Sequence, residues 1–285
     1  TSELHAFTMF DHFFGAGGRI FDSAFIYNNG MGDKYLGNWM SSRGVQGEVI
    51  VIGKAAHTPH CEPKFIRPQI IESLERLQTT KLDIFCLHRD NPEVPVSEFI
   101  DALTEVKNEG LIDLIGASNW EFHRFSQARD YASISGRESF TVLSNNFSLA
   151  EMIEPVWPGC VGVTDQYLNY LIEEEVMLFP WSSQARGFFI KQKEVMSSDH
   201  FSNPNLDEEI RVWHHEKNLK RRQACFDIAE EKNVQPIQIA LAYVLHKSHL
   251  IFPLIGPRTV FETNSSIQAS QINLTSKELQ ALAQD

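Results

Sequence analysis

Short apolar runs alternate with longer amphipathic segments along the whole chain, and this alternation constrains the fold more than any other feature of the sequence. It is typical of βαβ units, in which a helix joins two consecutive parallel strands. Because the runs are apolar at nearly every position, we expect both faces of each strand to be covered, as in a β/α barrel or a doubly wound sheet. The predicted strands are 19–22, 49–53, 82–87, 114–117, 141–143, 177–181 and 251–255, and the predicted helices are 2–15, 33–42, 68–78, 96–109, 121–134, 165–175, 217–232 and 236–247.

Charge and cysteine content restrict the partners of the protein. Among its 285 residues, 37 acidic side chains outnumber 25 basic ones, and the net charge of −12 argues against nucleic acid or an anionic membrane surface as a partner. No apolar run approaches the roughly 20 residues that cross a bilayer, and the chain does not open with a leader, which predicts a soluble protein. The four cysteines occur singly with wide gaps, which predicts a reduced, cytoplasmic protein. The sequence leaves the oligomeric state open.

Four ionisable residues follow the ends of successive predicted strands. Asp22 and Tyr27 follow the first strand, Lys54 the second and His88 the third. The carboxyl ends of parallel strands in a β/α barrel meet at one mouth, where active sites of that architecture lie, so we expect these side chains to be neighbours. Each also has an ordinary structural alternative, which is a helix cap for Asp22, packing for Tyr27, a solvated charge for Lys54 and a satisfied structural histidine for His88.

The motifs around these residues resemble those of a known family. The stretches Phe-Asp-Ser-Ala-Phe-Ile-Tyr, Ile-Gly-Lys, Leu-His-Arg-Asp and Gly-Ala-Ser-Asn-Trp, in this order, look like the motifs of the aldo-keto reductases, and the resemblance extends over essentially the whole chain. It implies a single (β/α)8 TIM barrel domain over residues 1–285 and an enzyme that passes a hydride from a nicotinamide cofactor to a carbonyl carbon. A closed barrel needs eight strands. Because the chain opens directly in a predicted helix, we expect the first strand to be absent from it.

The resemblance also implies a catalytic tetrad of Asp22, Tyr27, Lys54 and His88, with Tyr27 as the general acid. A free tyrosine, with a pKa near 10, is a poor acid at neutral pH, and an ammonium group beside it lowers that value. Lys54 is expected to supply this charge, while Asp22 holds the ammonium in place. His88 is expected to donate a hydrogen bond to the substrate oxygen.

Further residues match the family's cofactor site. Ser118 and Asn119 match residues that bind the nicotinamide carboxamide, although either can also cap the following helix. Ser144 stands where the family carries Gln, and Asn145 is a possible substitute for that amide. Trp181 matches the aromatic ring that stacks on the nicotinamide, with packing at the barrel top as the alternative. The expected cofactor-binding residues are Ser118, Asn119, Ser144, Trp181, Ser182, Arg186, Gly256, Arg258 and Glu262.

The segment Gly256-Pro257-Arg258-Thr259 leads from a predicted strand into a helix, and helix N-termini bind anions through their unpaired N–H groups. In the family this place holds the adenosine phosphates, and Arg258 is suited to face the 2′-phosphate of NADP. Glu262 stands where Gln or Arg is usual, and Ser265-Ser266 replaces a common Glu-Asn pair, which argues the other way. We expect NADP, with NAD as the alternative.

Other interpretations of the chain remain open. A cofactor-binding sensor or regulatory, subunit-like barrel with little turnover is consistent with the altered positions 144, 262 and 265–266, although the complete tetrad argues against it. A β/α-barrel enzyme that takes a phosphate-bearing substrate at Gly256–Arg258 is a third possibility. We expect no metal, because His57-Thr58-Pro59-His60-Cys61 lacks a second set of ligands. The polar segment 190–215 is predicted to be a loop over one barrel mouth.

Overall fold

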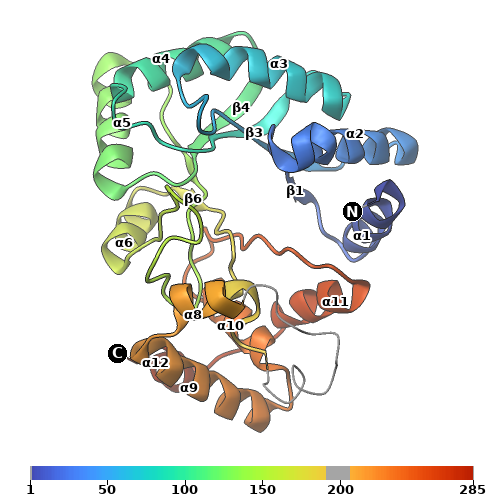
Figure 1. Ribbon diagram of the computed structural model, residues 1–285, viewed down its shortest axis with the longest axis vertical. Helices are drawn as coiled ribbons and strands as arrows, with labels where there is room; N and C mark the ends of the chain where they lie inside the picture. The colour runs from blue at the N-terminus through green and yellow to red at the C-terminus, as the bar shows by residue number, and fades with distance from the viewer. Residues whose placement is uncertain (1, 191–205, 285) are drawn as a thin grey trace. The chain divides into compact units, whose positions relative to one another are not determined.

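The structure is a computed structural model that describes residues 2–190 and 206–284 (Figure 1). The chain divides into two compact units. Unit 1 comprises Thr1–Ser144 and Glu173–Met177, and unit 2 comprises Asn145–Ile172 and Leu178–Asp285. This division does not test the single barrel domain expected for residues 1–285, which stays a prediction.

The sheet contains six strands in the order in which they occur along the chain, and β1 to β5 pair in parallel (Figure 1). The central strands are buried at nearly every position, because a sheet of this kind is covered on both faces. All six strands overlap the predicted ones. Their bounds are β1 Ile20–Asp22, β2 Ile50–Ala55, β3 Leu82–Leu87, β4 Ile112–Ala117, β5 Val142–Leu143 and β6 Met177–Leu178.

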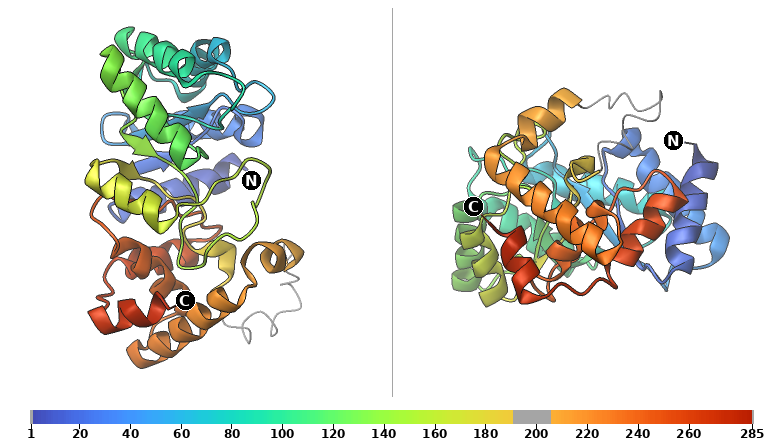
Figure 2. Two further views of the ribbon diagram at one scale, coloured as in Figure 1. Left: turned by 90° about the vertical axis from the view of Figure 1, so that its left-hand side faces the viewer. Right: turned by 90° about the horizontal axis from the view of Figure 1, so that it is seen from below.

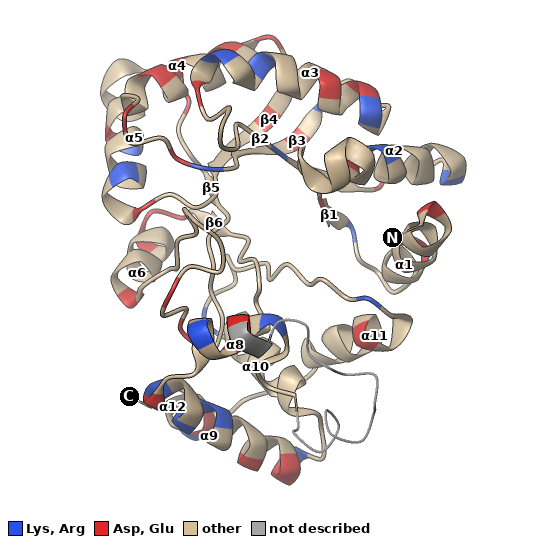
Figure 3. Ribbon diagram, viewed as in Figure 1, with Lys and Arg blue, Asp and Glu red and all other residues tan. Residues whose placement is uncertain are grey.

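In unit 1 a helix follows each of the first four strands, and one more helix precedes β1. Figure 2 shows α4 and α5 side by side, and Figure 3 shows the charged residues that mark α3 and α4 along their lengths. Helix α4 illustrates why these segments are helical, because Val96, Phe99, Ile100 and Leu103 form a buried stripe at helical spacing. The helices of unit 1 are α1 Glu3–Gly15, α2 Met31–Arg43, α3 Ile66–Leu77, α4 Val96–Asn108 and α5 Phe122–Ser135.

An aromatic cluster anchors the first strand of unit 1. Phe21 of β1 lies 5.6 Å from Phe10 of α1 and 5.0 Å from Trp39 of α2, measured between ring centroids. Trp39 is completely buried, and its indole N–H donates to the carboxylate of Asp11 at 2.8 Å. Buried aromatic rings of this size contribute heavily to core stability. The cluster therefore holds β1, which carries the first of the predicted site residues.

Unit 2 contains most of the remaining helices, and their starts follow the signals of the sequence. Thr259 caps α11 by accepting from the Glu262 N–H at 3.2 Å, and capping boxes begin α10 at Gln235 and α12 at Thr275. Helix α6 runs from Asp165 to Glu173, and its residues up to Ile172 belong to unit 2. The other helices are α8 Leu206–Trp213, α9 Glu216–Lys232, α10 Pro236–Leu245, α11 Val260–Ala269 and α12 Ser276–Leu282, and the short 3-10 turns of the chain are η1 Tyr27–Gly30, η2 Pro63–Phe65 and η3 Ala185–Gly187.

The predicted strand 251–255 was wrong in extent. Only Ile251 forms a bridge, in parallel with Leu178, although the N–H groups of Phe252 and Leu254 still donate to carbonyl oxygens of 178 and 180. Proline lacks an N–H donor, and Pro180 therefore leaves a gap in the ladder between the donor of Leu178 and the bonds from Phe252 and Leu254. The predicted strand 177–181 ends early for the same reason.

The predicted loop 190–215 was wrong in its second half. Residues 206–213 form helix α8, because apolar positions recur at helical spacing and bury Val212 and Trp213. Residues 191–205 lie outside the described residues. Helix α12 was not among the predicted helices. Within the described part of the chain, no helix has the length and hydropathy needed to cross a membrane.

Candidate active site

The structure brings Asp22, Tyr27, Lys54 and His88 together at one edge of the sheet in unit 1. Asp22 ends β1, Lys54 lies in β2 and His88 directly follows β3. The parallel register aligns the three strand ends, and the backbone N–H of His88 donates to the carbonyl of Ala55 at 2.7 Å. Tyr27 opens the 3-10 turn η1 after β1. The expected proximity of the four residues therefore follows from the strand order.

A tight turn presents the phenol of Tyr27. Asn28 and Asn29 adopt left-handed backbone conformations, with φ of 48° and 53°, and Gly30 follows with φ of 85°. Asparagine tolerates this conformation better than most residues, and glycine tolerates it without steric cost. Arg76 of α3 holds the same loop, because its guanidinium donates to the Phe25 carbonyl at 3.0 Å. The loop is thus held by its own turn and by the hydrogen bond from Arg76 of α3.

Lys54 forms a buried ion pair with Asp22. The ammonium donates to the Asp22 carboxylate and also to the carbonyl oxygen of Ser23, at 3.0 Å. Only 3% of the Lys54 side chain is exposed, and burial disfavours its charge more than any other single effect. The charge and hydrogen bond of Asp22, together with Tyr27 and Cys86, more than offset burial, and the pKa of Lys54 is raised. Lys54 therefore carries a positive charge at neutral pH.

Tyr27 lies beside this ammonium. The Lys54 nitrogen is 5.2 Å from the centroid of the phenol ring, and Tyr27, at 37% exposure, lines a cavity of about 290 Å³ together with Asp22 and Ser23. Loss of hydration raises the pKa of Tyr27, and the charge of Lys54 lowers it by less. The expected net lowering is therefore absent in this structure. Tyr27 holds its proton at neutral pH, as a general acid must.

His88 completes the group. Its ring lies 5.6 Å from the Tyr27 ring and 4.9 Å from the His57 ring, in edge-to-face geometry in both cases. Burial, followed by the charges of Lys54 and Arg89, holds the pKa of His88 well below its usual value. The imidazole is therefore neutral at neutral pH and has one N–H to donate. Within the described part of the chain, its Nδ1 atom is buried without a hydrogen-bond partner.

The low pKa of His88 predicts a stability change with pH. Above pH 6.5 the imidazole is neutral in both states, whereas below it the unfolded chain binds a proton that folded His88 rejects. The free energy of unfolding should therefore fall by up to about 1.4 kcal/mol per pH unit as the pH drops from about 6.5 towards the folded pKa. His88→Asn should remove this part of the slope, measured by urea unfolding between pH 5 and pH 8. Equal slopes in the two proteins would contradict the prediction.

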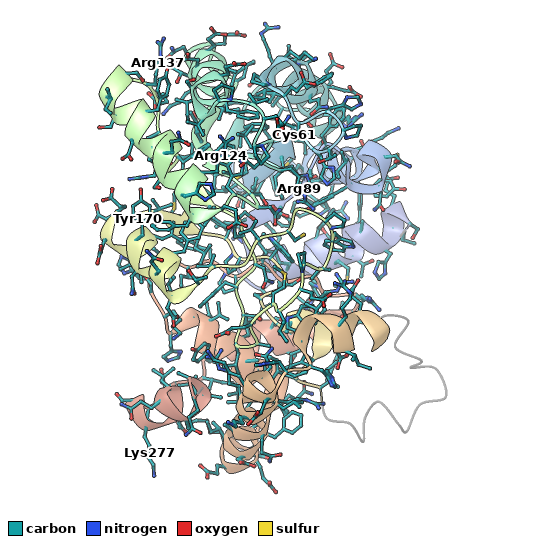
Figure 4. All side chains as sticks on the ribbon, turned by 60° about the vertical axis from the view of Figure 1, so that its left-hand side comes forward. Cys61, Arg89, Arg124, Arg137, Tyr170 and Lys277 are labelled. Carbon is teal, nitrogen blue, oxygen red and sulfur yellow. The ribbon has the colours of Figure 1, made fainter. Side chains whose placement is uncertain are left out.

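Backbone contacts hold His88 and the residue after it. The His88 carbonyl accepts from Arg89 Nη1 at 2.9 Å, and the Arg89 carbonyl accepts from Trp120 Nε1 at 3.3 Å and from Cys61 Sγ at 3.1 Å. Figure 4 labels Arg89, Cys61 and Arg124, which lie in this part of unit 1. Arg124 in turn pairs with Asp90 through two hydrogen bonds. Side-chain hydrogen bonds to the backbone therefore hold the end of β3 and the His88 that follows it.

Three of the expected cofactor residues also lie in unit 1. Ser118 and Asn119 follow β4, and Ser144 follows β5. Ser118 Oγ donates to the Ser144 carbonyl at 2.6 Å, and the Asn119 amide donates to Ser118 Oγ at 3.0 Å and to the His88 carbonyl at 3.3 Å. Within the described residues, the buried hydroxyl of Ser144 has no hydrogen-bond partner. A buried polar atom of this kind suits contact with a polar ligand.

Trp181, Ser182 and Arg186 belong to unit 2. Trp181 is partly buried, its ring lies 6.3 Å from that of Trp157, and its indole N–H has no partner among the described residues. Ser182 is left-handed, with φ of 49°. Arg186 stacks over Trp157 at 5.1 Å and forms an ion pair with Glu208 at 2.9 Å. Arg186 is thus engaged within its own unit.

Gly256, Arg258 and Glu262 also lie in unit 2, at the start of α11. The Glu262 carboxylate accepts from the backbone N–H of Arg258 at 2.5 Å, while the Glu262 N–H donates to the cap residue Thr259. A side chain added at Gly256 would meet nothing within 4 Å, so this turn is open. The N-terminus of α11 therefore already holds one carboxylate, which competes with an anionic ligand.

One buried residue close to the tetrad was not among the predicted site residues. Asp33 of α2 is 1% exposed and accepts hydrogen bonds from Ser23 and Ser73. A signal for it was present, because Asp33, Leu36, Gly37 and Met40 recur at helical spacing, which puts an acid in the apolar stripe of α2. A charge in such a stripe needs a partner.

Comparison with known proteins settles the family. The model of the Aldo/keto reductase family matches residues 1–284. The chain belongs to the Aldo/keto reductase family. It is similar to norsolorinic acid reductase B of Aspergillus parasiticus, with 27% identity over 99% of this chain and 74% of that protein. It is also similar to an aryl-alcohol dehydrogenase [NADP(+)] of Phanerodontia chrysosporium, with 24% identity over 97% of this chain and 74% of the relative.

The fold is confirmed by a solved structure as well. A thermostable aldo-keto reductase in complex with the inhibitor epalrestat aligns with a TM-score of 0.75, at 20% identity, over 99% of this chain and 87% of the other. With its parallel strands and following helices, the chain is an incomplete (β/α)8 barrel. As an aldo/keto reductase it is an oxidoreductase, and the family reduces carbonyl groups with NAD(P)H.

Proposed function

We propose that this aldo/keto reductase is an NADP-dependent reductase of aldehyde, ketone or sugar carbonyls, with Tyr27 as the general acid. The observation that carries the proposal is the convergence of Asp22, Tyr27, Lys54 and His88 at one edge of the sheet. A protein that only binds a nucleotide has no need of a phenol, a buried ion pair and a neutral imidazole in one place.

Each of these side chains has a distinct task in the proposed reaction. The bound nicotinamide supplies the hydride. Tyr27 gives its proton to the carbonyl oxygen, and the Lys54 ammonium stabilises the phenolate that remains. Asp22 keeps the ammonium charged and in place. Neutral His88 donates a hydrogen bond to the same oxygen, which orients the carbonyl and stabilises its developing negative charge.

The residues present fit a nicotinamide cofactor. A carboxamide group needs polar partners, and the Ser144 hydroxyl is buried without one among the described residues, close to Ser118 and Asn119. We assign these three residues to the carboxamide. We assign Trp181 to the face of the nicotinamide ring, and Ser182, Arg186, Gly256, Arg258 and Glu262 to the rest of the nucleotide.

The names of the relatives suggest which class of carbonyl substrate to propose. An aryl-alcohol dehydrogenase and several norsolorinic acid reductases are among them. We therefore propose that aromatic aldehydes and ketones are the first substrates to test. We also propose a reduced, cytoplasmic setting, which the four buried, free cysteines support.

The function is tested by following the absorbance of NADPH with para-nitrobenzaldehyde as the substrate. We expect turnover with both NADPH and NADH, and a KM for NADPH about tenfold lower, because Arg258 adds a charge-assisted contact to the 2′-phosphate. Binding of NADPH without turnover of any aldehyde would favour the sensor alternative. A clear preference for NADH would overturn the assignment of NADP.

A conservative variant at the start of α11 tests how the charge of Glu262 affects nucleotide binding. Glu262→Gln keeps an oxygen for the Arg258 N–H but removes the negative charge at the N-terminus of α11. It should lower the KM for NADPH about two- to fivefold and change that for NADH less. An equal change in the KM values for NADPH and NADH would show that Glu262 does not act on the 2′-phosphate.

A further inference from the structure

Asp33 is a second buried carboxylate behind the tetrad. It lies in α2 and is 1% exposed. One of its oxygens accepts from Ser23 Oγ and the other accepts from Ser73 Oγ at 2.8 Å. Asp33 thereby joins β1 to α3, and both of its oxygens are used.

Ser23 connects this carboxylate to Lys54. Its hydroxyl donates to Asp33, while its backbone carbonyl accepts from the Lys54 ammonium at 3.0 Å. Ser23 is itself 3% exposed, so water does not replace either contact. The position of the carbonyl that holds Lys54 thus depends on the contact between the Ser23 hydroxyl and Asp33.

The geometry of an ammonium group makes this contact important. Lys54 has three N–H donors in tetrahedral arrangement. One points to Asp22 and another to the Ser23 carbonyl, and the nitrogen lies 5.2 Å from the centroid of the Tyr27 ring. When two donors are fixed, the direction of the third is also fixed. The Ser23 carbonyl therefore helps to fix the position of the ammonium group, and the direction of its third N–H, relative to the phenol.

The pKa of Asp33 is raised overall, because burial outweighs the contacts that favour its charge. Burial raises its pKa, while the hydrogen bonds from Ser23 and Ser73 and the charges of Arg76 and Lys54 lower it. Two hydroxyl donors on two oxygens suit an ionised carboxylate, which only accepts. Arg76 lies on α3, one turn from Ser73, and also holds the Tyr27 loop through the Phe25 carbonyl.

We propose that Asp33 is a positioning residue for the Lys54 ammonium and acts on it through Ser23. The inference rests on the proposed roles of Lys54 and Tyr27. The charges acting on Tyr27 are those of Lys54, Asp22 and Arg89. A change of Tyr27 ionisation in a variant of Ser23 or Asp33 therefore reports a displaced Lys54. A carboxylate that only ties α2 to its neighbours would leave this ionisation unchanged.

The test uses Ser23→Ala, Asp33→Asn and the double variant. Ser23→Ala keeps the carbonyl but removes its tether, and we expect kcat to fall about tenfold with little change in the KM for NADPH. The pH at which Tyr27 loses its proton should rise by about 0.5 to 1 unit in both single variants. Because both changes break the same link, the double variant should lose no more than the larger single loss.

Two controls make the outcome decisive. Thr104 of α4 is buried, and its hydroxyl accepts from the Glu138 N–H and donates to the Ile100 carbonyl, so it bonds to residues outside the tetrad. Thr104→Ala should therefore lower stability without moving the Tyr27 titration. The titration itself is read without cofactor, from phenolate absorbance referenced to Tyr27→Phe, so it remains valid if the wild type shows no turnover. An unchanged titration in both single variants, or losses that multiply in the double variant, would overturn the proposal.

Discussion

Replacing Tyr27 with Phe should lower kcat about 10²- to 10⁴-fold and leave the KM for NADPH nearly unchanged. The variant keeps the aromatic ring against His88 and under the Lys54 charge, and it loses only the hydroxyl. Tyr27 is protonated at neutral pH, so its hydroxyl can serve as the proposed proton donor, and phenylalanine lacks that proton. Steady-state kinetics with para-nitrobenzaldehyde measures the change in kcat, and nucleotide titration measures the affinity for the cofactor.

Tyr131→Phe is the matched control for this prediction. It makes the same chemical change in α5 of the same unit, where the phenol oxygen lies 3.1 Å from an Asp101 carboxylate oxygen. This hydroxyl has no place in the proposed reaction, so kcat should stay within about twofold of the wild type. Turnover at the wild-type rate in Tyr27→Phe would refute the role of Tyr27.

Replacing Lys54 with Met should destabilise the fold by about 3–5 kcal/mol as well as abolish turnover. Lys54 and Asp22 form a buried ion pair, with 3% and 20% of their side chains exposed. Removal of the ammonium leaves the Asp22 carboxylate without its counter-charge in a region of low dielectric, which is costly. Urea unfolding at neutral pH measures the loss of stability.

The double variant Asp22→Asn with Lys54→Met separates stability from activity. It removes both charges, so most of the lost stability should return, while turnover should stay absent because no cation stabilises the phenolate. Wild-type stability in Lys54→Met would show that the pair is not desolvated as the structure has it. Turnover in the double variant would remove Lys54 from the proposed mechanism.

Part of this site was predictable because parallel topology converts sequence order into spatial proximity. The strand predicted at 82–87 has those bounds in the structure. His88, which follows it, lies beside Tyr27 because β1, β2 and β3 are aligned in parallel. The family motifs added the proposed roles. The chain's membership in the Aldo/keto reductase family confirms that resemblance.

Other features depended on contacts between distant residues. The predicted strand 251–255 was reduced to a bridge, since Pro180 in the facing segment lacks the N–H that would continue the ladder. The expected fall in the pKa of Tyr27 was reversed, because burial reduces the hydration of the phenol and this effect exceeds that of Lys54. The residues that bury it come from other parts of the chain. Helix α8 was missed because its apolar positions span only eight residues inside a polar segment, and the burial of Val212 and Trp213 appears only in the folded chain.

The sequence by itself determined the alternation of strands and helices, the order of the tetrad residues and the family, because periodicity and motifs are local properties of a chain. Tertiary structure alone decided the burial of the pair of Lys54 and Asp22, the upward shift of the pKa of Tyr27 and the contact of Asp33 with Ser23. Ionisation depends on burial and on charges within a few ångströms, and these are set by residues that come together only on folding.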